Sequence, residues 1–395
     1  MRLFRAFALI VVAFCASFAW SQAPSAKKTP YTDLGHFKGG AWAEACETNN
    51  AGIVVGFGNI RQGYTRPLFV FATGPNAGKW FDLGTLGGER TDWKVMAMGV
   101  SDTGIISGHS ALKDGTIHAF VWTPDAGMLD IGTLNGDAYS ASSNMNRMGT
   151  VVTGWSGPRF LDFSDPNVTT STPVVWTPSP KWQGGKLVTV WNIQRLDTTG
   201  FDSNKLWLPN AANDYAQVVG LSVSPAGMDA PMLWTPLPGE RGWSVSQLPI
   251  PPGFDQAGAN DINDKGEVAG WVAPADWSMW FPVVWKPLDT SRTTYTYVLL
   301  TSLSGSVQDG NGGWAEANGI NDLGDVVGDS WDASGNNDVA VVWNLRTPDT
   351  VQSLGLPDAW NVAAKINDLR MIVAYYAPDW TNEYVNENVV TIQLH

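Results

Sequence analysis

"GGWAEANGINDLGDVVGDS", residues 312–330, and "GGAWAEACETNNAGIVVGFG", residues 39–58, are two versions of one phrase within a single chain. Each has a tryptophan, an apolar run, a turn rich in Asn, and a second apolar run that ends in glycine. That glycine position recurs at Gly56, Gly108, Gly154, Gly220, Gly270 and Gly328, with Ala374 in a seventh copy. A period of roughly 50 residues is typical of propellers and solenoids.

Each repeat contains four short apolar segments, and an Asn-Asp-x-Gly turn joins the first two. Such turns suit tight hairpins, because Asn, Asp and Gly tolerate positive φ. The last repeat ends after its third segment, whereas a lone fourth segment, "YTDLGHF", opens the repeat region at residues 31–37. We therefore predict an all-β fold, a seven-bladed β-propeller of four-stranded antiparallel blades, closed by the N-terminal strand that completes the last blade. A parallel β-solenoid is the main alternative, but its coils are usually shorter.

The repeats resemble those of the HAF-repeat extracellular proteins, named for a His-Ala-Phe triplet. His118-Ala119-Phe120 matches that triplet once, while "DLGTLGG" (residues 82–88) and "GINDLGDVVG" (residues 319–328) match other signatures of the family. The likeness covers most of the chain after residue 23, although other residues replace the triplet in the other repeats. The resemblance implies secretion and a repeat architecture, and it brings no catalytic residues.

The first residues have the features of a secretory signal peptide: Arg2 and Arg5, an apolar run, and a small-residue cleavage site near Ala23. The predicted organisation is a signal peptide at 1–23, a linker at 24–30 and one propeller domain at 31–395, in a secreted or periplasmic protein. Loss of the two arginines takes the net charge from −13 to −15. We expect no nucleic-acid partner, no membrane span and a monomer. Cys46 is the one cysteine after residue 23, and we expect it to be buried.

Aromatic residues are aligned at the start of the predicted inner strands. Trp42, Tyr139, Trp314 and Trp360 share one column, and Trp93 and Trp207 lie next to it. Trp314, Trp360 and Trp42 belong to neighbouring blades and should form a contiguous arc. Loops on the same end of the propeller add further aromatic and acidic side chains. The predicted ligand-binding residues are Trp42, Tyr139, Trp314, Trp360, Trp93, Trp207, Trp271, Trp331, Glu44 and Glu316.

Packing between blades is the competing interpretation of these tryptophans. We assign it to the third-strand tryptophans, namely Trp122, Trp176, Trp234, Trp285 and Trp343. The Asn-Asp turns each offer too few oxygen ligands for calcium, and four scattered histidines do not suggest zinc. We expect no metal and no cofactor.

Aromatic rings among polar groups suit a ligand with apolar faces and hydroxyl rims. The predicted function is therefore non-catalytic binding, with carbohydrate or a cell-surface protein as the partner. The alternatives are an extracellular polysaccharide-active enzyme, a lyase or glycosidase, and a protein-interaction scaffold. An enzyme would use polar residues that depart from the repeat, such as Arg90, Lys94, His109, Arg147 and Asp309.

Overall fold

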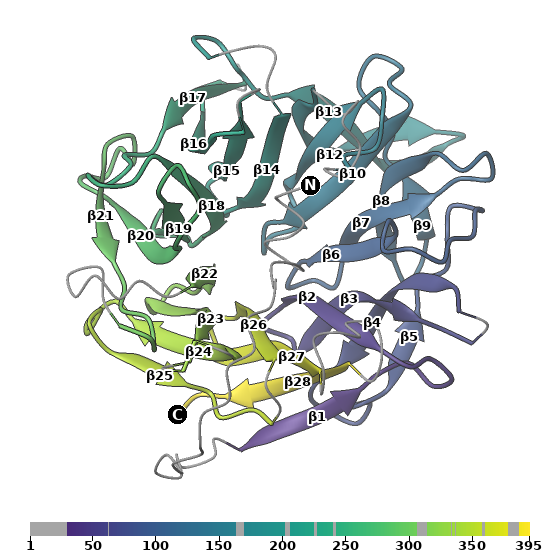
Figure 1. Cartoon of the computed structure of the whole chain (residues 1–395). Coiled ribbons are helices and arrows are strands. Elements are labelled where there is room, and N and C mark those ends of the chain that lie inside the picture. Colours follow the sequence, from purple (N-terminus) through teal and green to yellow (C-terminus); the bar gives the residue numbers. More distant parts are fainter. Residues whose placement is uncertain are drawn as a thin grey trace.

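The chain forms a β-propeller around a central axis (Figure 1). The computed structural model describes residues 30–61, 63–162, 170–201, 206–224, 227–239, 242–305, 314–332, 334–335, 337–357, 360–377 and 387–395. The predicted signal peptide, residues 1–23, lies outside the described residues, as does the linker apart from Pro30. Among the described residues no helix has the length and apolar character needed to cross a bilayer.

Five four-stranded antiparallel sheets follow one another along the chain. The first comprises β2 (Ala43–Thr48), β3 (Ile53–Asn59), β4 (Thr65–Phe71) and β5 (Trp80–Asp82). The second comprises β6 (Met96–Val100), β7 (Ile106–Ala111), β8 (Ile117–Thr123) and β9 (Gly127–Asp130). The third comprises β10 (Tyr139–Met145), β11 (Val152–Gly157), β12 (Thr172–Gln183) and β13 (Lys186–Arg195). The fourth comprises β14 (Leu206–Ala212), β15 (Val218–Val223), β16 (Asp229–Pro236) and β17 (Trp243–Gln247). The fifth comprises β18 (Gln256–Ile262), β19 (Val268–Ala273), β20 (Phe281–Pro287) and β21 (Tyr295–Leu299).

The remaining strands form one eight-stranded sheet. Its first part is β22 (Ala315–Ile320), β23 (Asp325–Trp331), β24 (Asp338–Asn344) and β25 (Val351–Ser353). Its second part is β26 (Trp360–Ile366), β27 (Met371–Ala377), β28 (Asn388–Gln393) and β1 (Tyr31–Gly35). A single parallel pair, Asp338 with Trp360, joins the two parts. The N-terminal strand β1 pairs antiparallel with β28, as the sequence predicts.

A β-bulge explains the glycine that ends the second segment of each repeat. Every inner strand shifts register at the same place, for example between Ala45 and Glu47 and between Ala317 and Gly319. The glycine of the next strand lies opposite this point. A Cβ on Gly56 or Gly328 would lie 1.9 Å from a carbonyl oxygen of the inner strand, so only glycine fits without backbone movement.

The Asn-Asp turns do more than reverse the chain, because they bind one another around the ring. The Asn321 amide Nδ2 donates to the carbonyl of Asn367 at 3.0 Å, and Asn367 donates to the carbonyl of Asn49 at 2.8 Å. A second bond accompanies each, as where Asp322 N donates to Asp368 Oδ1 at 2.9 Å. Equivalent contacts join the other successive turns. The turns therefore form a continuous hydrogen-bonded circle.

Apolar side chains fill the space between successive sheets. Val362, Val373 and Val389 pack against Ala43 and Val54, so the core continues across the junction between the last strands and the first sheet. The third-strand tryptophans Trp234, Trp285 and Trp343 are at most 1% exposed. Each donates its indole N–H to a carbonyl that follows the outer strand of the preceding sheet. Their predicted packing role is confirmed.

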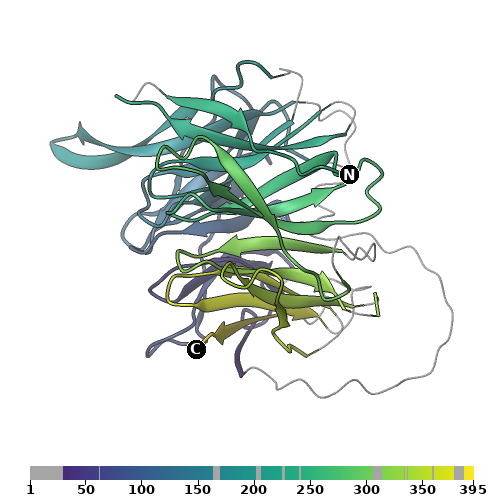
Figure 2. The same cartoon turned by 90° about the vertical axis from the view of Figure 1, so that its left-hand side faces the viewer.

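One hairpin departs from the repeat. The third strand β12 has 12 residues, whereas the other third strands have six to eight. The outer strand β13 has 10 residues, whereas the other outer strands have three to five. In Figure 2 this teal hairpin projects to the left, beyond the other loops of the ring.

Replacing Asn321 should destabilise the ring strongly. Its side chain is fully buried, its Oδ1 accepts two N–H groups of its own turn, and its Nδ2 donates to the next turn. Asn321→Ala should lower the free energy of unfolding by about 2–4 kcal/mol, because several buried polar groups lose partners. Urea denaturation measures this effect. Leu323→Ala, in the same turn but exposed, should change stability by less than about 0.5 kcal/mol; similar losses in both variants would contradict this role for the amide.

Candidate functional site

Strand register confirms the aromatic column expected from the sequence. In each repeat one inner-strand residue lies opposite the recurring glycine or Ala374, and the column residue lies three positions before it. The column is Trp42, Lys94, Tyr139, Leu206, Gln256, Trp314 and Trp360. These positions lie where the inner strands begin, at the end of the central channel opposite the Asn-Asp turns.

Trp314 belongs to a contiguous group of indoles in mutual contact. Its ring centroid is 5.5 Å from that of Trp280 and 5.6 Å from that of Trp331. Trp280 in turn stacks on Trp271 at 4.7 Å with an interplanar angle of 15°, and Trp277 contacts both. We call Trp277, Trp280, Trp314 and Trp331 the tryptophan row. Trp277, Trp314 and Trp331 are partly exposed, whereas Trp280 is buried.

The row runs in a different direction from the expected arc. Trp314 contacts tryptophans of the preceding sheet and of its own repeat, while Trp360 contacts Tyr375 and Trp42 meets Phe57 edge-on. The loop between β19 and β20 causes this, because it pairs Trp280 with Trp314 as a parallel bridge. Trp277 and Trp280 stand outside the repeated segments, so alignment of the repeats does not identify their partner.

Several predicted ligand-binding residues are packed inside the protein. Trp207 and Trp271 are each 2% exposed, Glu316 is 5% exposed and Trp42 is 6% exposed. Trp207 packs against Trp234, and Trp271 packs under Trp280. Their side chains therefore support the face rather than form its surface in this structure.

A second aromatic cluster surrounds Phe160, at the same end of the ring. Trp93, Tyr139 and Trp155 contact the Phe160 ring, and the Lys94 ammonium lies 5.6 Å from its centroid. Lys94 also forms a 2.8 Å ion pair with Asp162. Trp93 and Tyr139 are thus half-buried parts of a packed cluster.

Three carboxyl groups lie beside the tryptophan row, of which the Glu316 residue is buried and the Asp329 and Asp338 residues are partly buried. Glu316 follows Trp314 by two residues, Asp329 pairs with Glu316 across the strands, and Asp338 pairs with Trp331. Burial raises the pKa of Asp329 to about 6 and raises the pKa values of Glu316 and Asp338 well above normal. Asp329 and Asp338 are hydrogen-bonded to each other, which requires a shared proton.

Two oxygens of this carboxyl cluster lack hydrogen-bond partners. Glu316 Oε2 and Asp338 Oδ1 are both buried, and no described residue donates to either. Sequence reasoning identified Glu316 but missed Asp338 as a site residue. The available signal was the alternating segment "DVAVVW", which places Asp338 at the start of a strand.

Glu44, also predicted as a ligand-binding residue, is half-buried near Cys46 and Tyr375. Burial raises the pKa of the Cys46 thiol, and the Glu44 carboxylate adds to this effect. Burial likewise raises the pKa of Tyr375, again with a contribution from Glu44. The Lys365 ammonium acts in the opposite direction on the Cys46 thiol and lowers its pKa.

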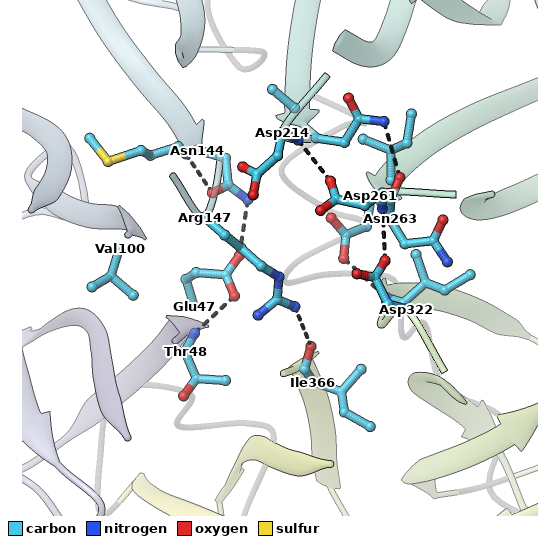
Figure 3. A pocket seen from close by; sticks show the side chains of 16 residues that line it. Glu47, Thr48, Val100, Asn144, Arg147, Asp214, Asp261, Asn263, Asp322 and Ile366 are labelled. Atoms are coloured by element: carbon cyan, nitrogen blue, oxygen red, sulfur yellow. Dashed lines mark hydrogen bonds between the residues drawn. The ribbon is translucent and has the colours of Figure 1, made fainter. Parts of the chain in front are cut away.

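The turn end of the channel is closed by polar contacts (Figure 3). Asn144 donates to Glu47 at 3.0 Å, and Lys365 pairs with Asp261 at 3.1 Å. Arg147 reaches Asp368 at 3.4 Å and the carbonyl of Ile366 at 3.3 Å. A cavity of about 40 Å³ persists among these side chains, which is room for a few waters.

The polar residues considered for an enzyme are divided between the two ends of the channel. Lys94 and His109 both contact the Phe160 ring, and Arg90 pairs with Asp92, whereas Arg147 lies at the turn end. Burial lowers the pKa of His109 to about 4. Asp309 lies outside the described residues. Within the described ranges, no group of three or more His, Cys, Asp or Glu side chains is arranged to hold a metal ion.

No family model and no curated protein matches the chain. Two solved structures are similar in fold. Porphyromonas gingivalis dipeptidyl peptidase 4 is 10% identical, with a TM-score of 0.41 over 84% of this chain and 48% of that chain. Trypanosoma rangeli sialidase, in complex with 2,3-difluorosialic acid as a covalent intermediate, is 9% identical, with a TM-score of 0.38 over 92% of this chain and 58% of that chain. The chain thus spans about half the length of these proteins, and the likeness is one of β-propeller fold.

The carboxyl cluster should make stability depend on pH. A carboxyl group in the unfolded chain titrates near pH 4, whereas Asp329 in the folded protein titrates at about 6. The unfolded state therefore loses its proton first, and the free energy of unfolding should fall as pH rises from about 4 through 6, by on the order of 2 kcal/mol. Urea titrations at several pH values measure the slope.

Glu316→Gln should raise stability at pH 7 and flatten this slope, since the amide carries no charge to desolvate. Asp125→Asn, which alters an exposed carboxyl group in a loop of the second sheet, serves as the control. An equal slope in the parent protein and in Glu316→Gln would show that the cluster does not control the pH dependence.

Proposed function

We propose that this protein is a non-catalytic binding propeller that recognises carbohydrate at the tryptophan row. The observation that carries the proposal is the contiguous set of indoles, three of them partly exposed, across two neighbouring sheets. Flat aromatic surfaces match the apolar faces of sugar rings, and polar groups beside them can bond hydroxyls. Asp276 and Ser278 flank Trp277, and Asp332 follows Trp331.

Repetition argues against catalysis at this end of the ring. Glu44 and Glu316 occupy equivalent repeat positions two residues after Trp42 and Trp314, as expected of scaffold positions. The Asp329–Asp338 pair is partly buried and shares a proton, whereas glycosidase carboxyl groups stand about 5 Å or more apart around a substrate. The alternative functions are an enzyme and a protein-interaction scaffold, and the test below distinguishes each of them from carbohydrate binding.

The eight-stranded sheet is best counted as two blades, since one residue pair joins its halves. The propeller then has seven blades, the last completed by β1. Together with the resemblance to HAF-repeat proteins and the signal-peptide features of residues 1–23, this supports a secreted or periplasmic protein. A binding role outside the cytoplasm fits a ligand such as a polysaccharide or a cell-surface protein.

Binding should be lost when the row is interrupted. In affinity electrophoresis through gels that contain individual polysaccharides, at least one polymer should retard the protein, and Trp314→Ala should weaken that retardation at least tenfold, as expected when a central aromatic anchor is removed. Tyr215→Ala is the matched control, because Tyr215 is an aromatic residue, 59% exposed, in an Asn-Asp turn at the other end of the ring.

The same samples should contain no new reducing ends or unsaturated products. Product formation would replace the binding proposal with an enzyme. Absence of retardation across plant and microbial polymers would favour the scaffold. Equal weakening in Trp314→Ala and Tyr215→Ala would remove the row from the binding site.

A further inference from the structure

The β12–β13 hairpin is a rigid projection with an apolar tip. Ten cross-strand pairs run from Val174 with Arg195 to Gln183 with Lys186. Gly184 and Gly185, at φ +56° and +76°, form the two-residue turn that suits the twist of a hairpin. The tip therefore holds a defined shape beyond the ring.

The apolar side chains of this hairpin share one face. Trp182 is directly opposite Leu187, and Pro178 is directly opposite Trp191, so alternation places Trp182, Leu187 and Trp191 on the same side. Trp191 packs on the core between the second and third sheets. The same face continues outward, where Trp182 is 74% exposed and Leu187 is 59% exposed. The hairpin thus overhangs its neighbour with its packing face uncovered.

A groove lies under this overhang. It has a volume of about 580 Å³ and separates the hairpin from β9 and the residues that follow β9. Its walls include Val190 and Trp191 on one side and Leu129 and Ile131 on the other. Leu129 is itself 45% exposed. An exposed tryptophan beside an apolar groove marks an interaction surface.

We propose that a second copy of this chain covers this surface, with the Trp182 tip of each copy seated in the groove of the other. The tip and the groove lie next to each other on one molecule, so a single twofold axis can place each tip in the groove of the other copy. Charge agrees locally, because Lys181 and Lys186 flank the tip and the groove is lined by Asp130, whose carboxylate also contacts His118 of its own chain at 2.9 Å. The sequence alone predicts a monomer; the overhanging hairpin is the observation that argues for a dimer.

Analytical ultracentrifugation of the purified protein from about 1 to 200 µM tests the proposal. The expected result is twice the monomer mass at the upper end of the range. Trp182→Ser should weaken self-association at least tenfold, while Leu288→Ser, which alters an equally isolated exposed side chain at 61% exposure, should leave it unchanged. A monomer at every concentration would overturn the proposal, as would equal effects of the two substitutions.

A crosslinking experiment tests the geometry. Trp182→Cys and Leu129→Cys are prepared as separate proteins with tags of different size, in a Cys46→Ser background, and mixed under mild oxidation. The expected product is a disulfide-linked pair carrying one tag of each size. Absence of that mixed pair, in a sample that still sediments as a dimer, would refute the tip-in-groove arrangement. Binding of the monomer to anionic phosphatidylglycerol vesicles, lost in Trp182→Ser, would assign the tip to a lipid surface instead.

Discussion

The circle of hydrogen bonds between Asn-Asp turns constrains the whole molecule. Asn367 bonds to Asn49 across 318 residues of chain, so the circle holds together residues from its two ends. Each asparagine uses its oxygen to fix its own turn and its nitrogen to fix the next one. A turn therefore cannot shift without breaking bonds on both sides. This end of the channel is committed to structure, which leaves the opposite end and the rim for recognition.

Much of the fold was predictable because its signals are local and repeated. The glycine opposite the bulge, the turn asparagine and the third-strand tryptophan each recur in most of the repeats, so alignment of the repeats identifies them. The site was less predictable because its decisive contacts are not repeated. Trp280 lies in a loop of one repeat and stacks on Trp314 of the next, and Asp338 becomes significant only when folding places it beside Asp329. The long hairpin was likewise hard to predict, because "KWQGGKLVTVW" (residues 181–191) extends β12 and β13 beyond the segments that the repeats share.

Electrostatics differ sharply between the two ends of the channel. At the turn end, Arg147 pairs with Asp368 and Lys365 pairs with Asp261, so part of the negative charge there has a basic partner. Beside the tryptophan row, Glu316, Asp329 and Asp338 are buried or partly buried without a basic partner among the described residues, and two of their oxygens accept no hydrogen bond. Burial of uncompensated polar groups costs free energy. Glu316 has a counterpart in Glu44, but among the seven repeats the residue after the recurring glycine is acidic at Asp329 alone. The Asp329–Asp338 pair therefore points to a role specific to this part of the ring.

A ring of near-identical sheets makes departures from the repeat informative. Identical residues in several sheets satisfy the same packing requirement, whereas a feature present once must be explained by something outside the scaffold. Two such features stand out, the loop that carries Trp277 and Trp280, and the hairpin that carries Trp182. They lie at opposite ends of the ring and expose aromatic surface in different settings: one row lies over buried carboxyl groups, and one tip overhangs an apolar groove. Because no described residue of one contacts the other, the proposed ligand at the row and the proposed partner at the hairpin would act independently.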